Sequence, residues 1–190
     1  MEKIYIQDEK FIRIDFPEDP LKIADYENCT FINCNFSNTD LSKITFVECE
    51  FLGCNLSMVK LLKTALKEIK FKDCKLLGLH FENCSEFLFA VDFDNCILNL
   101  SSFYKVKLKN TIFKRSTLHE VDFSEADLKH SIFDNCDLAG AKFENCDLQQ
   151  SDFRTSYNYS IDPELNRITK AKFSTVGVVG LLDKYDIEIE

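Results

Sequence analysis

The chain has 190 residues, the length of one ordinary domain, and 45% of them are hydrophobic, so it can bury a substantial core. The formal net charge of −9 argues against nucleic acid as a direct ligand, because phosphates are bound by Lys and Arg, but it permits a basic protein partner. The chain has no apolar run of the roughly 18 residues that a membrane span needs and no signal-peptide core at its start, so we expect a cytoplasmic protein without a membrane segment.

The first predicted element is an N-terminal cap over residues 1–23. Its apolar residues lack the repeat that follows, and they suggest a short strand or hairpin over the first end of the fold. These residues are Ile4, Ile6, Ile12, Ile14 and Phe16.

The second element, residues 24–153, is a repeat of five residues. A central apolar residue recurs 12 times from Tyr26 to Phe81 and 13 times from Phe93 to Phe153. The residue two positions before each centre in the second run is small or β-branched and never charged. Helices and flat strands have periods of about 3.6 and 2, so neither explains this pattern. Four five-residue sides instead close a square coil of about 20 residues, and such coils stack at a strand spacing of roughly 4.8 Å.

In the second run of the repeat, Phe and Leu alternate strictly as the central residue. On a four-sided coil this alternation places Phe on two opposite sides and Leu on the other two. The first run breaks the order with Leu56, Leu61 and Leu66, so we expect a less regular cross-section there.

All nine cysteines occupy the small position two residues before a centre, where Cys behaves as a small hydrophobe. Core packing is therefore favoured over a metal site or disulfides, and no cofactor is predicted. His80, His119 and His130 lack ligand spacing with any Cys, and no group of residues suits nucleophilic or acid–base catalysis, so we expect no enzyme. The cysteines are Cys29, Cys34, Cys49, Cys54, Cys74, Cys84, Cys96, Cys136 and Cys146.

A two-residue insertion interrupts the repeat within residues 82–92. Extra strand residues usually form a bulge or kink, and the alternative is a short recognition loop.

The third element, residues 154–190, is predicted to be a short α-helical cap that also forms a dimer. Asp162 and Pro163 suit the start of one helix, Ala171 to Phe173 suits a further strand, and Ser174 can cap a second helix. The end of the chain, from Asp186 to Glu190, alternates like a final strand. A simple plug of the core is the alternative to a dimer. The predicted interface residues are Val176, Val178, Val179, Leu181 and Leu182.

The segments Cys-Asp-Leu-Ala-Gly, Ala-Asp-Leu-Lys-His and Ala-Lys-Phe-Glu-Asn resemble the A(D/N)LXX motif of pentapeptide-repeat proteins. The resemblance covers residues 24–153 and implies an all-β solenoid, the right-handed quadrilateral β-helix. Since this solenoid serves several roles, the motif alone says little about function.

The segment from Asn158 to Pro163, with Ala171-Lys172-Phe173-Ser174 and Gly180-Leu181-Leu182, is similar to the C-terminal end of the gyrase-protecting Qnr, MfpA and AlbG group. This resemblance implies a C-terminal homodimer, a rod that imitates duplex DNA, and binding to DNA gyrase or topoisomerase IV with protection against quinolones. Qnr proteins carry long projecting loops, whereas this chain has only the two-residue insertion and looks more like the loopless members.

Acidic residues are concentrated in the second half of the repeat. Residues 120–152 contain nine acids and two bases, a net charge of −7, whereas residues 21–90 have a net charge of −1. A tail-to-tail dimer of two such rods would be about 60 Å long, similar to about 18 base pairs of DNA. The predicted partner-binding acids are Glu120, Asp122, Glu125, Asp127, Asp134, Asp137, Glu144, Asp147 and Asp152, with Asp127 and Asp147 on one side of the coil.

Two functions are therefore expected. The first is a non-enzymatic DNA mimic that engages a type II topoisomerase. The second is a structural or scaffold module with another protein partner, in which the acidic surface only keeps the rod dissolved.

Overall fold

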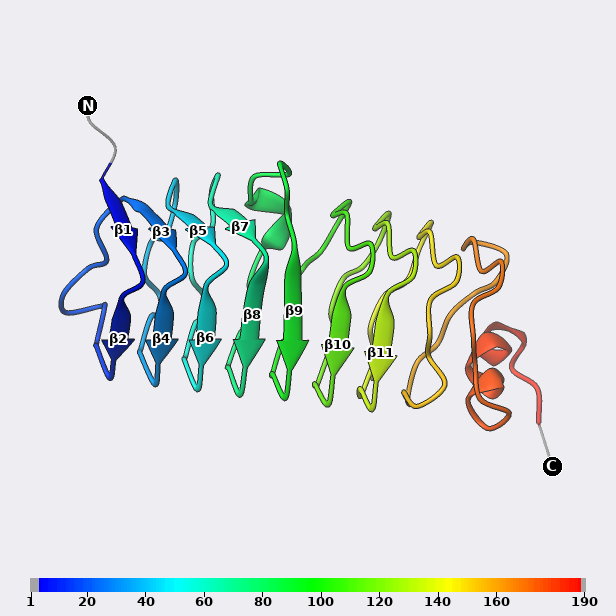
Figure 1. Ribbon diagram of the computed structural model, residues 1–190. Helices are drawn as coiled ribbons and strands as arrows, with labels where there is room; N and C mark the ends of the chain where they lie inside the picture. The colour runs from blue at the N-terminus through cyan, green and yellow to red at the C-terminus, as the bar shows by residue number, and fades with distance from the viewer. Residues whose placement is uncertain (1–3, 189–190) are drawn as a thin grey trace.

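The computed structural model describes residues 4–188 and is a rod of stacked coils (Figure 1). The strands belong to two parallel sheets, one in the order β1-β3-β5-β7 and one in the order β2-β4-β6-β8-β9-β10-β11. The strands are β1 (Tyr5–Gln7), β2 (Lys10–Ile12), β3 (Asp25–Glu27), β4 (Thr30–Ile32), β5 (Thr45–Val47), β6 (Glu50–Leu52), β7 (Ala65–Lys67), β8 (Ile69–Lys72), β9 (Val91–Asp94), β10 (Ile112–Lys114) and β11 (Ile132–Asp134).

The pairing between coils follows the predicted repeat. Phe31 pairs with Phe51, which is four repeats further along the chain, and single bridges such as that between Asp127 and Asp147 keep the same step. Across the insertion, Phe71 pairs with Phe93, so the two extra residues are absorbed without a change of side. We number the four sides of the coil by their central residues in one coil, Tyr26 (side 1), Phe31 (side 2), Phe36 (side 3) and Leu41 (side 4).

The corners of the coil are turned by residues other than glycine. Twenty-six described non-glycine residues have a left-handed backbone, with φ between 49° and 66°, and most lie two positions after a centre. This conformation costs roughly 1–2 kcal/mol per residue. The corner N–H groups are used between coils, since Asn33 donates to the Leu52 carbonyl at 2.7 Å and Lys43 to the Leu62 carbonyl at 3.0 Å. This ladder explains how a chain with five glycines can turn so often.

The core is built from columns of like side chains. Side 2 stacks nine phenylalanine rings from Phe11 to Phe173, with centroids 4.6 to 5.5 Å apart and planes within 23° of parallel. Side 4 stacks Phe81, Phe103, Phe123 and Phe143 opposite them, and rings of the two sides meet nearly perpendicular, as Phe123 and Phe133 do at 90°. The predicted alternation of Phe and Leu sides is confirmed.

The cysteines are buried in the core as free thiols, and their predicted inward position is confirmed. Cys34, Cys54 and Cys74 lie in one column, where the Cys34 N–H contacts the Cys54 sulfur at 3.4 Å. Burial raises the pKa of Cys49 and of Cys84 to about 12, so these thiols stay protonated at neutral pH.

The N-terminal residues continue the coil. The expected short strand is present, as β1 and β2, but the alternative of a hairpin is wrong, because β1 pairs in parallel with β3 and β2 with β4, each one full coil later. Ile6 and Phe11 enter the columns of sides 1 and 2. The pattern is hidden in the sequence because Glu9 and Asp19 stand at small positions of this first coil.

The C-terminal cap differs from the predicted α-helices. Its two helical segments, η2 (Gly177–Leu181) and η3 (Asp183–Tyr185), are 3₁₀-helices. The expected helix at Asp162 is a turn in which the Asp162 carboxylate accepts the Glu164 N–H at 2.8 Å.

Two further expectations concern the end of the chain. Lys172 bridges to Asp152, which extends the coil, while residues 186–188 form no strand. Ile189 and Glu190 lie outside the described residues. No helix within residues 4–188 is long and apolar enough to cross a membrane.

Candidate functional site

Five of the nine predicted partner-binding acids hold the turns of the coil. Each stands directly before a central residue, and its Oδ1 accepts the backbone N–H two residues later, at 2.9 to 3.4 Å. Side-chain hydrogen bonds of this kind are why Asp is favoured in turns. Part of the acidity is therefore a structural requirement of the repeat. These residues are Asp122, Asp127, Asp137, Asp147 and Asp152.

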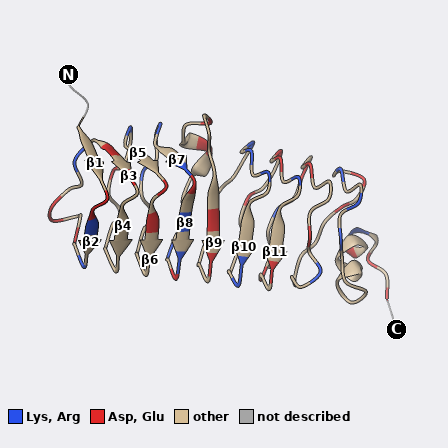
Figure 2. Ribbon diagram, viewed as in Figure 1, with Lys and Arg blue, Asp and Glu red and all other residues tan. Residues whose placement is uncertain are grey.

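The acids surround the rod instead of forming one surface. The bridges place Asp127 and Asp147 together on side 1, as predicted, but Asp152 on side 2, Asp137 on side 3 and Asp122 on side 4. Figure 2 shows acidic and basic segments interspersed along the rod. This spread follows from the five-residue period, because successive repeats along the chain lie on different sides.

Most of these acids are paired with a base, usually from a neighbouring coil. Lys109 lies 3.1 Å from Asp127, and Asp147 lies 3.0 Å from both Lys129 and Arg167. Lys105 lies 3.4 Å from Glu125. Such pairs leave little net charge on side 1.

Two further acids have lowered pKa values. The hydrogen bond from Arg154, at 2.7 Å, holds the pKa of Asp152 below its usual value. For Asp137, burial acts to raise the pKa, but bonds from His119 and Asn158 outweigh it and lower the pKa. His119 is thus a half-buried partner of Asp137, at 2.8 Å.

Four predicted acids, Glu120, Asp122, Asp134 and Glu144, have no ion pair among the described residues. Glu120, Asp122 and Glu144 lie on side 4 or at the corner that leads to it, and we call these three the acidic strip. Asp134, on side 2, instead accepts a hydrogen bond from Thr155 at 3.0 Å. The strip is narrower than the predicted surface, and its three carboxylates lack an ion-pair partner among the described residues.

The predicted interface residues lie on the C-terminal cap. Val176 is 84% exposed and Val178 and Val179 are each 42% exposed, whereas Leu181 packs against the core. Four more exposed apolar side chains lie in the same part of the chain. They are Tyr157, Leu165, Tyr185 and Ile187.

The cap is fastened to the last coil by charge and by close packing. Lys184 pairs with Asp162 at 2.8 Å and Glu164 at 2.7 Å. Gly177 and Gly180 pack directly on Tyr159, so that a Cβ at either glycine would collide with it. The role of these two glycines depends on a contact with a residue earlier in the chain, which the sequence alone does not reveal.

The model of the pentapeptide repeat region matches residues 24–85 and 87–158, more than half of the chain. The chain belongs to the pentapeptide repeat family. No curated protein matches its sequence.

Solved structures of other pentapeptide-repeat proteins share its fold. A trypsin-treated form of QnrB1, a plasmid-mediated fluoroquinolone resistance protein, is 20% identical, with a TM-score of 0.64, and the match covers 99% of this chain and 98% of that chain. HetL, which is involved in heterocyst differentiation regulation in the cyanobacterium Nostoc sp. strain PCC 7120, is 16% identical, with a TM-score of 0.66 and coverage of 90% and 86%. At these identities the likeness concerns the fold.

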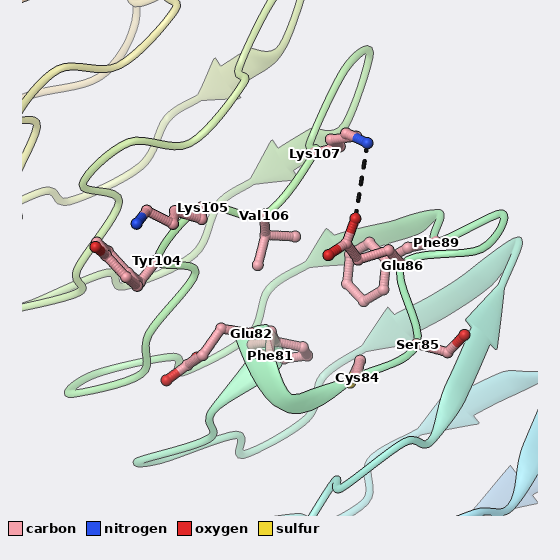
Figure 3. A pocket seen from close by; sticks show the side chains of 10 residues that line it. All are labelled: Phe81, Glu82, Cys84, Ser85, Glu86, Phe89, Tyr104, Lys105, Val106 and Lys107. Atoms are coloured by element: carbon pink, nitrogen blue, oxygen red, sulfur yellow. Dashed lines mark ion pairs between the residues drawn. The ribbon is translucent and has the colours of Figure 1, made fainter.

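The insertion of this pentapeptide-repeat protein encloses only a small cavity beside η1 (Phe81–Asn83) (Figure 3). Its volume of about 60 Å³ has room for about two water molecules and none for an organic substrate. Glu86 and Lys107 face each other across it at 3.7 Å, while Phe87 and Leu88 are exposed. Within residues 4–188, no three His, Cys, Asp or Glu side chains gather in a way that could hold a metal ion.

Proposed function

We propose that this pentapeptide-repeat protein is a non-enzymatic binding protein that occupies the DNA-binding surface of a type II topoisomerase, DNA gyrase or topoisomerase IV. The observation that carries the proposal is the acidic strip of Glu120, Asp122 and Glu144 on the half of the rod that ends at the exposed apolar cap. Unpaired carboxylates can meet the Lys and Arg residues that otherwise hold DNA phosphates. The fold shared with QnrB1, a fluoroquinolone resistance protein, supports a role in protection against quinolones.

The length of the rod supports the proposal as well. The stack on side 2 has eight steps from Phe11 to Phe173, each of roughly 5 Å, or about 40 Å per chain. Two chains joined at their C-terminal caps would give about 80 Å, the length of about 24 base pairs of DNA. This is longer than the sequence suggested, because both ends of the chain continue the coil.

The exposed valines of the cap support a C-terminal homodimer. A short 3₁₀ segment with no buried residue gains little from its own hydrogen bonds, so Val176, Val178 and Val179 need a surface to cover them. A closed two-fold dimer is the commonest arrangement that does so. Changing Val178 and Val179 to Glu should abolish association through the C-terminal caps, measured by sedimentation, while Leu62→Glu, an exposed change on side 4, should leave the mass unchanged.

The function is tested by DNA supercoiling with purified gyrase, with and without a quinolone. At micromolar concentration, the wild-type protein should either inhibit supercoiling by gyrase or relieve the inhibition of gyrase by the quinolone. Glu120→Gln, Asp122→Asn and Glu144→Gln together should weaken this effect at least about tenfold, because each removes a charge-assisted contact. A control with Glu27, Glu48 and Glu68 changed to Gln removes as many charges from the other half of the rod. If wild type is inert, or if both triple variants behave alike, the proposal is wrong.

A second candidate, a scaffold that binds another protein, is favoured by side 3. From Asn35 to Leu100 the outward positions of this side carry one charged residue, Lys75. Met58, Ile97 and Leu100 are exposed there, and depletion of charge is typical of the centre of an interface. Ile97→Asp with Leu100→Asp should then abolish binding of that protein partner without changing any effect on supercoiling.

A further inference from the structure

The first coil exposes part of the core. Its inward residues Ile6, Phe11, Ile14 and Leu21 are only partly buried, although they occupy the same columns as residues that are at most 2% exposed one coil later. The difference arises because the first coil has a neighbour on one side only. Further large apolar residues of this coil are exposed outright. They are Ile4, Tyr5, Ile12 and Ile23.

The same end of the rod has open strand edges. β1 and β2 are the terminal strands of the two sheets, so no described strand pairs with their outer edges. Unpaired strand edges attract other strands. On the remaining sides the chain between residues 13 and 22 bows outward (Figure 1) and contains Pro17 and Pro20, which cannot donate backbone hydrogen bonds. Open pairing is thus confined to β1 and β2.

We propose that the β2 edge joins the β2 edge of a second copy of this chain in a two-fold, antiparallel pair centred on Phe11. The ring of Phe11 stacks on Phe31 at 4.7 Å on one face, and interior rings of this column have a second ring on the other face. In the joint, Phe11 of the second copy takes that place. A two-fold axis requires only that the edge be complementary to itself.

The charges of β2 fit this register. Pairing centred on Phe11 places Lys10 opposite Ile12 of the second copy, so the lysine stem lies against an apolar side chain and no like charges face each other. One position further out, Arg13 comes opposite Glu9 of the second copy. A single extended peptide could pair with the same edge, but it would not supply the ring for Phe11.

This joint is separate from the C-terminal dimer of the proposed function, since it lies at the other end of the rod (Figure 1). If both joints form, copies add head to head and tail to tail into a linear chain. If only one forms, the rods stop at dimers. The two joints can therefore be tested independently.

The test is the sedimentation of variants at Ile12 over a wide concentration range. Ile12→Lys and Ile12→Glu remove the same apolar surface. In each joint, Ile12→Lys places two lysines opposite the two Lys10 side chains, whereas Ile12→Glu places two glutamates opposite them. The association constant of the Ile12→Glu variant should exceed that of the Ile12→Lys variant at least about tenfold, because each joint then contains two cross-strand pairs of opposite charge. Adding Lys10→Glu to Ile12→Lys should restore association.

The matched controls are Ile32→Lys and Ile32→Glu, one coil further in, and they should associate like wild type. Circular dichroism establishes that each variant is folded. Equal association of the two Ile12 variants, or a wild type that stays at 22.1 kDa, overturns the joint. A dimer that responds to Val178 and Val179 but not to Ile12 also overturns it and leaves the C-terminal dimer standing.

Discussion

Phe123 illustrates how a single residue stabilises the rod. Its ring stacks between Phe103 at 5.4 Å and Phe143 at 5.1 Å, and it is fully buried. Changing it to Ala should lower the free energy of unfolding by about 3–5 kcal/mol, because both stacks lose their partner and a cavity is left. Phe87→Ala, at an exposed ring of the insertion, should cost less than about 0.5 kcal/mol. Chemical denaturation measures both, and a similar loss in the two variants would contradict the stacked core.

Tyr159 is a buried residue with an unsatisfied polar group. Its hydroxyl has no hydrogen-bond partner among the described residues, and burial raises its pKa. Tyr159→Phe should therefore stabilise the protein by about 1 kcal/mol, since an unsatisfied buried hydroxyl is removed.

Tyr26→Phe is the control for Tyr159. The Tyr26 hydroxyl donates to the Lys22 carbonyl at 2.9 Å, so this variant should lose stability. Thermal unfolding gives both values. Shifts of the same sign in the two variants would show that the Tyr159 hydroxyl is in fact bonded.

At the scale of elements, the Lys184 clamp makes the C-terminal cap sensitive to pH. The Lys184 hydrogen bonds lower the pKa values of Asp162 and Glu164, so their contribution is present at neutral pH and is lost as the pH falls through those lowered values. The pKa of Lys184 is raised by the same bonds, so its contribution is lost only as the pH rises above its usual value. The cap should therefore stay closed between roughly pH 5 and pH 10.

The amide chemical shifts of Gly177 and Gly180 report on this opening. The two amide shifts should move together on acidification, and Lys184→Met should abolish the transition, because Asp162 and Glu164 then no longer contribute a pH-dependent contact to the cap. A cap whose shifts follow the same titration with and without Lys184 would show that the clamp does not hold it.

The insertion is a second element whose effect is local. It lengthens one step between coils by two residues, yet Phe93 still pairs with Phe71 and stacks on it at 5.4 Å. The side columns therefore remain in register on both halves of the rod. The insertion adds the exposed residues Phe87 and Leu88, and it leaves a small cavity at the core, where Phe89 is only partly buried.

At the scale of the whole molecule, the rod is a one-dimensional stack, so complete coils should be removable. Deleting residues 105–124 removes one complete coil and keeps every later column in place, so the protein should fold as a shorter rod. Deleting residues 105–109 removes one side, which puts every later Phe into a Leu column and should reduce the melting temperature far more. Thermal unfolding and small-angle scattering compare the two. Greater stability of the shorter deletion would contradict the four-sided stack.

Much of the rod could be predicted because its information is local. The five-residue period states which side chains point inward, so the Phe and Leu columns and the buried cysteines followed from counting. The corners that join the sides are turned by ordinary residues such as Asn33 and Lys43. Inward and outward direction depends only on each residue and its neighbours, so the sequence by itself determined it.

Only the tertiary structure decided which charges are paired between coils and which have no ion-pair partner. Asp127 and Lys109, like Asp147 and Arg167, are separated by about one coil of the chain, and they meet because successive coils stack on each other. The first coil is concealed in the same way, since Glu9 and Asp19 break the pattern while the backbone of β2 still pairs with β4. Contacts between coils depend on register and on the reach of long side chains, and neither can be read from a five-residue motif.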